Sequence, residues 1–419
     1  MKSDKSPLRP SARLQHYLTS LVEALEREMA TSGIGSASLS IVRPYCAPVV
    51  RHYGDISSAV ADGSGTPIYQ IGSLSKSICA ATLMIVSDMG LIDADMTIAQ
   101  SFPDLFLPPD CSLARTRLID LARHVSPLGQ IEGTILKTPG NIYRDPIPII
   151  SAPRLLAHIG KNRSGRDRGV YHKFVYSDFG YALLGIALER YTGLGYGALV
   201  GRHISQKPGT NYREIFPSIH YLSLQDRERV AAKLPKSFGV LDSAFGGLAT
   251  ARGLSLFVHD LVSGRFLSRR ATARLVHTPI PFGPAGQGYA YGMGIARFPV
   301  GPFADGDACL GHLCVFQSTS GFAAHHYGSG MTICFLANAL SGMNTDGQRR
   351  DLNPGGLVRR IFVDANDLGK NEARLKRALS SNGTENTHKL AYRSSIPAVR
   401  GSRSGLSSPR AMISGSVKA

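Results

Sequence analysis

Residues 71–80 read Ile-Gly-Ser-Leu-Ser-Lys-Ser-Ile-Cys-Ala, so a hydroxyl group, Ser73, stands three positions before an ammonium group, Lys76. The apolar run 78–89 continues this stretch and predicts the start of a largely buried helix. Side chains three residues apart share one face of a helix, so Ser73 and Lys76 are expected to reach each other. A neighbouring base activates a serine nucleophile, and the N–H groups of a first helical turn can stabilise an oxyanion. The pattern suits acyl transfer, although a helix opening capped by Ser73 or Ser75 has the same residues.

The sequence on either side of this helix predicts further strands and helices. Strand-like runs cover residues 37–42, 49–53, 289–298, 321–327 and 331–337, with a turn at 328–330 joining the last two. Helical spacing of apolar residues covers 14–32, 118–122, 181–191, 227–232, 254–261 and 357–363. The glycine-rich run 193–197 follows a helix rather than a strand, which indicates a helix stop and not a dinucleotide-binding loop.

Strands at both ends of the chain and helices in its middle predict an α/β fold of the α+β sandwich type. The N- and C-terminal segments are expected to form one antiparallel sheet flanked by helices, with a mainly α-helical lobe inserted between them. The cleft between the sheet and this lobe is then the natural place for an active site. The expected divisions are a basic extension (1–13), a catalytic domain (14–369) with a sheet lobe (14–72 and 280–369) and a helical lobe (73–279), and a C-terminal tail (370–419).

The chain carries a formal net charge of +17, which raises nucleic acid as a possible partner. Residues 370–419 contain ten Lys and Arg but two acidic residues, in a segment rich in Ser, Gly and Asn. Such a composition buries too little apolar surface to fold, so a disordered basic tail is expected. Concentration of the charge in this tail argues against nucleic-acid binding by the rest of the chain.

The six cysteines include no Cys-x-x-Cys pair and no histidines at zinc-binding spacing, so neither a metal site nor a disulfide framework is predicted. Cys334, within an apolar run, is expected to be a buried thiol. The first residues lack the apolar core of a signal peptide, and no run of about 18 apolar residues could span a membrane. We therefore expect a cytoplasmic protein without membrane contact.

A second motif lies downstream, where residues 174–185 read Phe-Val-Tyr-Ser-Asp-Phe-Gly-Tyr-Ala-Leu-Leu-Gly. Together with residues 71–77, it resembles the Tyr-x-Asn and Ser-x-x-Lys boxes of the serine β-lactamase and penicillin-binding protein superfamily. The resemblance is to the class C and D-alanyl-D-alanine carboxypeptidase branch, which includes esterases, D-aminopeptidases and acyltransferases. Residues 116–128, with His124, resemble that family's Leu-Leu-x-His-x-Ser-Gly loop, and residues 245–254 resemble its Gly-Gly-Leu helix start.

The resemblance implies roles for four residues of the first two boxes. Ser73 would be the nucleophile, Lys76 its base, and Tyr176 a proton shuttle, as a phenolate or as a neutral relay. Asp178 stands where the family usually has Asn; an amide can donate to a substrate carbonyl and an ionised carboxylate cannot, which would alter substrate choice or rate. Alternatively, Asp178 would pair with Lys76 and hold it charged, which would reduce its basicity. By its sequence alone, Tyr176 also fits a core tyrosine before a helix.

The family's third box, Lys-Thr-Gly or His-x-Gly on a strand, is matched best by His312-Leu313-Cys314. His312 would be an electrostatic partner of the substrate, and Cys314 replaces a glycine that lets the substrate approach the strand. Cysteine is small, so a narrowed rather than a closed site is expected. His326 and Gly328 give a second alignment, which is less favourable because Gly328 falls in the hairpin turn. A buried strand histidine is the other interpretation of His312.

These features predict a cytoplasmic serine hydrolase of the β-lactamase/penicillin-binding type that cleaves an amide or ester bond through a Ser73 acyl-enzyme. The substrate would be a small-molecule amide, ester or peptide. No cofactor, metal, nucleic acid or membrane is expected, and the oligomeric state is left open. Two alternatives share the fold: an acyltransferase that uses the same residues, and a binding protein whose catalysis is impaired by Asp178 and Cys314.

Overall fold

The structure is a computed structural model of the 419-residue chain. It describes Glu23 and residues 36–44, 46–54, 60–61, 66–130, 149–161, 173–210, 212–218, 238–283, 288–299, 308–316 and 319–338. Several expected segments lie outside the described residues: the extension 1–13, the tail 370–419, and the helices at 14–32 (apart from Glu23), 227–232 and 357–363.

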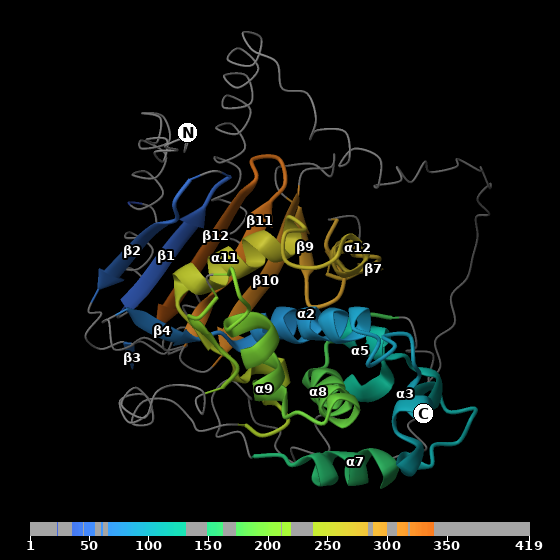
Figure 1. The fold of residues 1–419 in the computed structure, drawn as a ribbon. Coiled ribbons are helices and arrows are strands. Elements are labelled where there is room, and N and C mark those ends of the chain that lie inside the picture. Colours follow the sequence, from blue (N-terminus) through green and yellow to red (C-terminus); the bar gives the residue numbers. More distant parts are fainter. Residues whose placement is uncertain are drawn as a thin grey trace, which may run out of the picture. The chain divides into compact units, whose positions relative to one another are not determined.

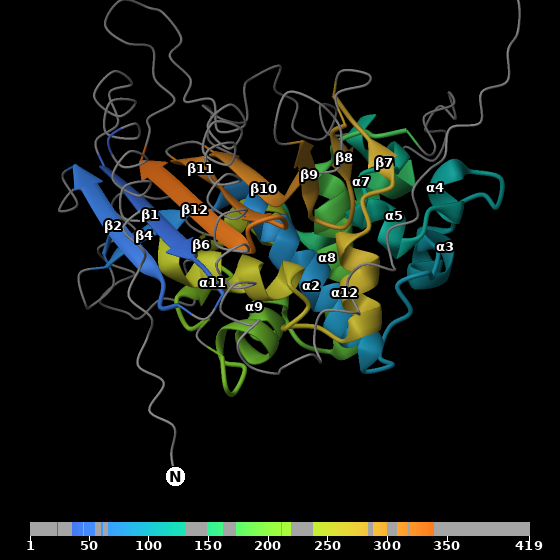
Figure 2. The ribbon, with the colours of Figure 1, turned by 90° about the horizontal axis from the view of Figure 1, so that it is seen from above.

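Eight antiparallel strands form the larger sheet, in the order β2-β1-β12-β11-β10-β9-β8-β7 (Figure 1 and Figure 2). The strands are β1 Ser36–Val42, β2 Val49–Gly54, β7 Ile280–Pro281, β8 Ala290–Tyr291, β9 Ala296–Pro299, β10 Ala308–Phe316, β11 Thr319–His326 and β12 Met331–Asn338. The first and last of the long strands are neighbours, because β1 pairs with β12 and Ser36 lies opposite Asn338. The prediction of one antiparallel sheet built from N- and C-terminal segments is confirmed.

Alternation along β1 separates the two faces of this sheet. Ala37, Leu39 and Ile41 belong to an apolar cluster on one face, as expected for side chains that alternate along a strand. On the other face, the Ser40 hydroxyl lies 2.7 Å from the Ser255 hydroxyl of helix α11 (Ala251–Val262). Small hydroxyl side chains on this face therefore let α11 pack closely on the strand.

The helices lie mainly in the middle of the chain, as predicted. They are α2 Ser75–Asp88, α3 Ile98–Ser101, α4 Ser112–Arg115, α5 Leu118–Ala122, α7 Ala152–Lys161, α8 Asp178–Thr192, α9 Tyr196–Val200, α11 and α12 Arg269–Val276. Gly193 ends α8 with a φ of +69°, so the predicted helix stop is confirmed. None of these described helices combines the length and apolar character needed to cross a membrane.

Helices α2 and α11 lie on the same side of the large sheet (Figure 2). Helix α2 packs against α8 and α9, within the predicted helical region. Helix α11 falls in the same expected region of the sequence, yet it packs on β1, β11 and β12. Apolar residues of α11 such as Leu254, Phe257 and Leu261 are fully buried, so a chain segment between the two sheet-forming ends also covers the sheet.

The predicted strand 289–298 is wrong as one element, because it is divided into β8 and β9 by a turn at residues 292–295. Gly294 has a φ of +63°, and a Cβ atom placed there would lie 2.4 Å from the Lys76 carbonyl oxygen. The Gly294 carbonyl accepts a hydrogen bond from Ser77 Oγ at 2.6 Å. A glycine that allows close backbone contact therefore brings this turn against α2, and alternation alone does not reveal it.

A smaller four-stranded sheet, in the order β3-β4-β6-β5, positions the start of α2. Its strands are β3 Val60–Ala61, β4 Pro67–Gln70, β5 Ile215–Phe216 and β6 Leu248–Ala249. Directly after β4, the Ile71 N–H donates to the Gly247 carbonyl at 2.9 Å, and the Gly247 N–H donates to Ser75 Oγ at 3.0 Å. These bonds connect the first motif to the Gly-Gly-Leu segment, which lies far away in the sequence.

Candidate active site

The first motif forms a tight turn that leads into α2. Ser73 lies in the 3-10 turn Gly72–Leu74 and is half-buried, whereas Lys76, in the first turn of α2, is fully buried. Gly72 has a φ of +47°, a backbone conformation that favours glycine. Lys76 Nζ lies 3.2 Å from Ser73 Oγ, within the reach that their spacing predicts. The hydroxyl therefore stays accessible while its nitrogen neighbour is enclosed.

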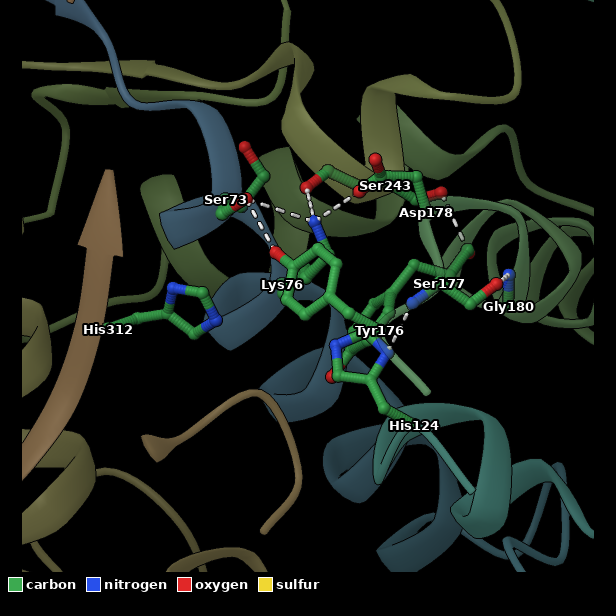
Figure 3. Close-up of polar contacts among 12 residues, drawn as sticks. Ser73, Lys76, His124, Tyr176, Ser177, Asp178, Gly180, Ser243 and His312 are labelled. Atoms are coloured by element: carbon green, nitrogen blue, oxygen red, sulfur yellow. Dashed lines mark hydrogen bonds and ion pairs between the residues drawn. The ribbon is translucent and has the colours of Figure 1, made fainter. Parts of the chain in front are cut away.

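Lys76 donates hydrogen bonds to three oxygen atoms. They are Ser73 Oγ at 3.2 Å, Asp178 Oδ1 at 2.6 Å and the Ala244 carbonyl at 2.9 Å (Figure 3). An ammonium group has three N–H donors, so each donor has an acceptor. A buried charge is tolerated when it is paired and hydrogen-bonded in this way. Of the two alternatives considered for Asp178, the structure shows the ion pair with Lys76.

Tyr176 approaches Ser73 from the segment before α8. Its hydroxyl donates to Ser73 Oγ at 2.6 Å, and Lys76 Nζ lies 4.8 Å from the centre of its ring. The next residue, Ser177, caps α8 by accepting a hydrogen bond from the Gly180 N–H at 2.9 Å. The helix cap therefore sets the direction in which the chain delivers Tyr176 to the serine.

His124 holds the backbone on both sides of Tyr176. Its carbonyl accepts from the Val175 N–H at 2.7 Å. Its Nδ1 accepts from the Ser177 N–H at 3.0 Å (Figure 3). Its ring centre lies 4.2 Å from that of Tyr176. His124 has a φ of +59°, which is uncommon outside glycine. Burial, with a smaller contribution from the charge of Lys76, lowers the pKa of His124 well below its usual range. The ring is therefore neutral, as an Nδ1 acceptor requires.

His312 on β10 is buried beside this group (Figure 3). Its ring centre lies 6.5 Å from that of Tyr176. Nδ1 lies 2.7 Å from the Leu313 carbonyl, and Nε2 lies 2.8 Å from the Tyr291 hydroxyl. A carbonyl can only accept, so Nδ1 carries the proton and Nε2 accepts from Tyr291. Burial lowers the pKa of His312 to about 3, so this imidazole is neutral at pH 7.

Cys314 lies two residues further along β10, on the same face of the strand as His312, and belongs to the apolar cluster that includes Ile71 and Leu74. It is fully buried, and its Sγ lies 3.7 Å from the Gln70 carbonyl. Burial raises the pKa of this thiol well above its usual range, so it is uncharged. His326, from the less favoured alignment, lies in the hairpin, where its Nδ1 is 2.9 Å from Ser329 Oγ. Ser73, Lys76, Tyr176 and Asp178 therefore form one hydrogen-bonded group, with His312 beside it, while the Cys314 thiol bonds the Gln70 carbonyl.

Three contributors to this group were not predicted as site residues. The Ala244 carbonyl binds Lys76, the Tyr291 hydroxyl binds His312, and His124 supports Tyr176. His124 had a sequence signal in the His-x-Ser loop, but the backbone carbonyl of Ala244 had none. Among the described residues, no group of three or more His, Cys, Asp or Glu side chains could hold a metal ion.

The chain is similar to a known protein family and to several solved structures. Residues 25–353 match the family model described as Beta-lactamase. The solved structures that resemble the chain include a D-amino acid amidase from Ochrobactrum anthropi SV3, with 20% identity and a TM-score of 0.63 over 83% of this chain and 99% of that one. A comparison with curated protein sequences found no match.

Two further structures have similar values. A class C β-lactamase from Rhodobacter sphaeroides has 17% identity and a TM-score of 0.59, covering 83% of this chain and 98% of that one. A β-lactamase/D-alanine carboxypeptidase from Pseudomonas syringae has 15% identity and a TM-score of 0.61, covering 84% of this chain and 99% of that one. At these identities the likeness demonstrates a shared fold.

Proposed function

The chain belongs to the β-lactamase family, and on this premise we propose that it is a serine hydrolase that cleaves an amide or ester bond through an acyl-enzyme on Ser73. The observation that supports this proposal most strongly is the half-buried Ser73 hydroxyl, which bonds Lys76 Nζ at 3.2 Å and Tyr176 Oη at 2.6 Å. The similar structures include a D-amino acid amidase and a D-alanine carboxypeptidase, which is consistent with a small amide substrate.

Before the acylation step, the Lys76 ammonium releases one proton to solvent. Lys76 in its amine form then accepts the Ser73 proton while Ser73 Oγ bonds the substrate carbonyl carbon. The amine form keeps two N–H donors, which suffice for Asp178 and the Ala244 carbonyl, and turns its lone pair to Ser73. Tyr176 gives its hydroxyl proton to the leaving group and regains a proton from the Lys76 ammonium. The bond to the leaving group breaks, and the acyl group remains on Ser73.

In the deacylation step, the same two residues activate a water molecule. Lys76 or Tyr176 accepts the water proton as the water oxygen attacks the acyl carbon, and Ser73 Oγ recovers a proton as its bond to carbon breaks. In both steps the backbone N–H of Ser73, in the turn before α2, supplies one donor to the oxyanion. The reaction therefore uses only groups of this chain together with substrate and water.

The neutral His312 enters this scheme as a polar group and not as a cation. Both of its nitrogens are engaged, by the Leu313 carbonyl and the Tyr291 hydroxyl. A substrate carboxylate would thus gain no ion pair from His312 at pH 7. The role of His312 is to hold Tyr291 and the aromatic surroundings of Tyr176 in place.

Covalent labelling tests the proposal. A fluorophosphonate should modify Ser73 in the wild-type protein, and peptide mass spectrometry should locate the adduct in residues 71–80. Ser73→Ala should abolish labelling, whereas Ser87→Ala, a half-buried serine of the same helix, should label at the wild-type rate. Equal labelling of wild type and Ser73→Ala would reject Ser73 as nucleophile, and no labelling of either would favour the binding-protein alternative.

A further inference from the structure

We infer that Asp178 selects substrates that carry a free α-ammonium group next to the scissile carbonyl and disfavours substrates that carry an N-acyl carbonyl there. The inference rests on the proposed function, because it concerns the substrate of the same site. It names the substrate class as amides or esters of unblocked α-amino acids.

Within the described residues, one carboxylate oxygen of Asp178 accepts a hydrogen bond and the other does not. Oδ1 accepts from Lys76 at 2.6 Å, while Oδ2 has no hydrogen-bond partner among the residues that the structure describes. The side chain is 13% exposed. Asp178 is the first residue of α8, where the helix dipole favours a negative charge. Oδ2 is therefore an anionic acceptor on a partly exposed side chain.

Asp178 lies at a distance from Ser73 that suits contact with the α-nitrogen of a substrate, which is attached one carbon away from the reacting carbonyl. Ser73 Oγ and Asp178 Oδ1 both bond to Lys76 Nζ, at 3.2 and 2.6 Å, so the carboxylate lies within two hydrogen-bond lengths of the nucleophile. An α-nitrogen is separated from the attacked carbon by a single carbon atom. A substrate held for attack by Ser73 thus brings its α-nitrogen into the neighbourhood of Asp178.

The chemistry of the carboxylate then decides between substrate classes. An ionised carboxylate only accepts hydrogen bonds, so it binds an ammonium group. It repels the oxygen of an acyl carbonyl, which is also only an acceptor. Within the described part of the site, Lys76 is the one cation, and its donors are directed to Ser73, Asp178 and the Ala244 carbonyl. The nearby His124 and His312 are neutral and do not repel an ammonium group.

A matched pair of substrates tests the inference. The probes are phenylalaninamide and N-acetylphenylalaninamide, each as both enantiomers, with ammonia release measured for wild type and for Asp178→Asn. An asparagine keeps the acceptor for Lys76 and places a donor at the second position. Wild type should prefer the free amine by about 10–100-fold in kcat/KM, the size expected when a buried polar group is left unpaired. Asp178→Asn should lower or reverse this ratio.

The pH dependence of the ratio gives a second readout. The preference of wild type for the free amine should decline above about pH 8, where an α-ammonium group loses its proton. A purely structural role of Asp178 would leave the ratio unchanged, because both substrates would lose activity equally in Asp178→Asn.

Fluorophosphonate labelling of Ser73 distinguishes failure of the inference from failure of the proposed function. The labelling rate is measured with and without each probe as a competitor. Two outcomes overturn the inference alone, both with Ser73 labelled by the fluorophosphonate. In the first, both probes are hydrolysed at equal rates and protect Ser73 from labelling equally. In the second, neither probe is hydrolysed and neither protects Ser73. Unlabelled Ser73 overturns the proposed function, and the inference with it.

Discussion

Two clusters of polar side chains in this protein have similar hydrogen bonds but different surroundings. In the candidate active site, Ser73 Oγ lies between Lys76 Nζ and Tyr176 Oη. Between α11 and the sheet, Thr332 Oγ1 lies 2.9 Å from Nδ1 of both His259 and His325. A hydroxyl held between two polar neighbours is therefore not in itself a sign of catalysis.

Exposure and charge distinguish the two groups. Ser73 is half-buried and its neighbour Lys76 is a paired ammonium, whereas Thr332 is fully buried. Burial lowers the pKa of His259 to about 4 and that of His325 to about 3, so both rings are neutral at pH 7. The first group therefore has the exposure and the charged neighbour that the proposed reaction requires, while the second satisfies hydrogen bonds between a helix and a sheet.

The largest expected effect comes from removing the charged member of the first group. Lys76→Met deletes the proposed base, so kcat/KM should fall by about 10²–10⁴-fold, the usual contribution of a general base. Steady-state kinetics on an amide or activated ester measures this loss. Lys161→Met, which changes an exposed lysine at the end of α7, serves as the control and should retain activity. A Lys76→Met enzyme within a few-fold of wild type would contradict the assignment.

An intermediate effect is expected for the buried histidine beside Tyr176. His124→Leu loses the acceptor for the Ser177 N–H and the contact with the Tyr176 ring, so kcat should fall about 10–100-fold, since each such loss costs about 1–3 kcal/mol. His124→Asn should recover part of this, because asparagine supplies an acceptor and tolerates a positive φ.

His325, a buried histidine of the second group, provides a comparison for the His124 variant. His325→Leu should lower the free energy of unfolding, measured with urea, without changing kcat, because His325 bonds only Thr332 within the hydrogen bonds described. If His325→Leu reduced kcat as much as His124→Leu, the supporting role of His124 would be only a general effect on stability.

The smallest expected effect is the acid sensitivity of the second group. A buried histidine with a lowered pKa binds fewer protons in the folded state than in the unfolded state. Its contribution to stability is therefore complete above about pH 6.5 and is lost as the pH falls toward its folded pKa. For His325, with a folded pKa of about 3, the loss at pH 5 is about 2 kcal/mol.

Urea unfolding at pH 7 and pH 5 measures this loss. His325→Leu, although less stable at pH 7, should lose about 2 kcal/mol less than wild type between the two pH values, because the variant lacks the titrating group. An unchanged difference between pH 7 and pH 5 would show that other groups account for the acid sensitivity.

Local sequence determines much of the fold. The apolar run after residue 77 and the strand patterns at 37–42, 321–327 and 331–337 are local signals, and α2, β1, β11 and β12 follow them. Ser73 and Lys76 were expected to meet because helical geometry alone brings side chains three residues apart together. The prediction that the N- and C-terminal strands share one sheet followed from the order of strands and helices along the chain.

Contacts between distant segments could not be predicted from local sequence patterns. Asp178 was open to two interpretations in the sequence, and the ion pair arose only when α8 was placed against α2. The division of 289–298 depends on Gly294 contacting the Lys76 backbone, and the contact of the Cys314 thiol with the Gln70 carbonyl joins two segments that lie far apart in the sequence. Periodicity records which face of an element is apolar, but which buried polar atoms meet depends on the separation and rotation of packed elements, and these are properties of the folded chain as a whole.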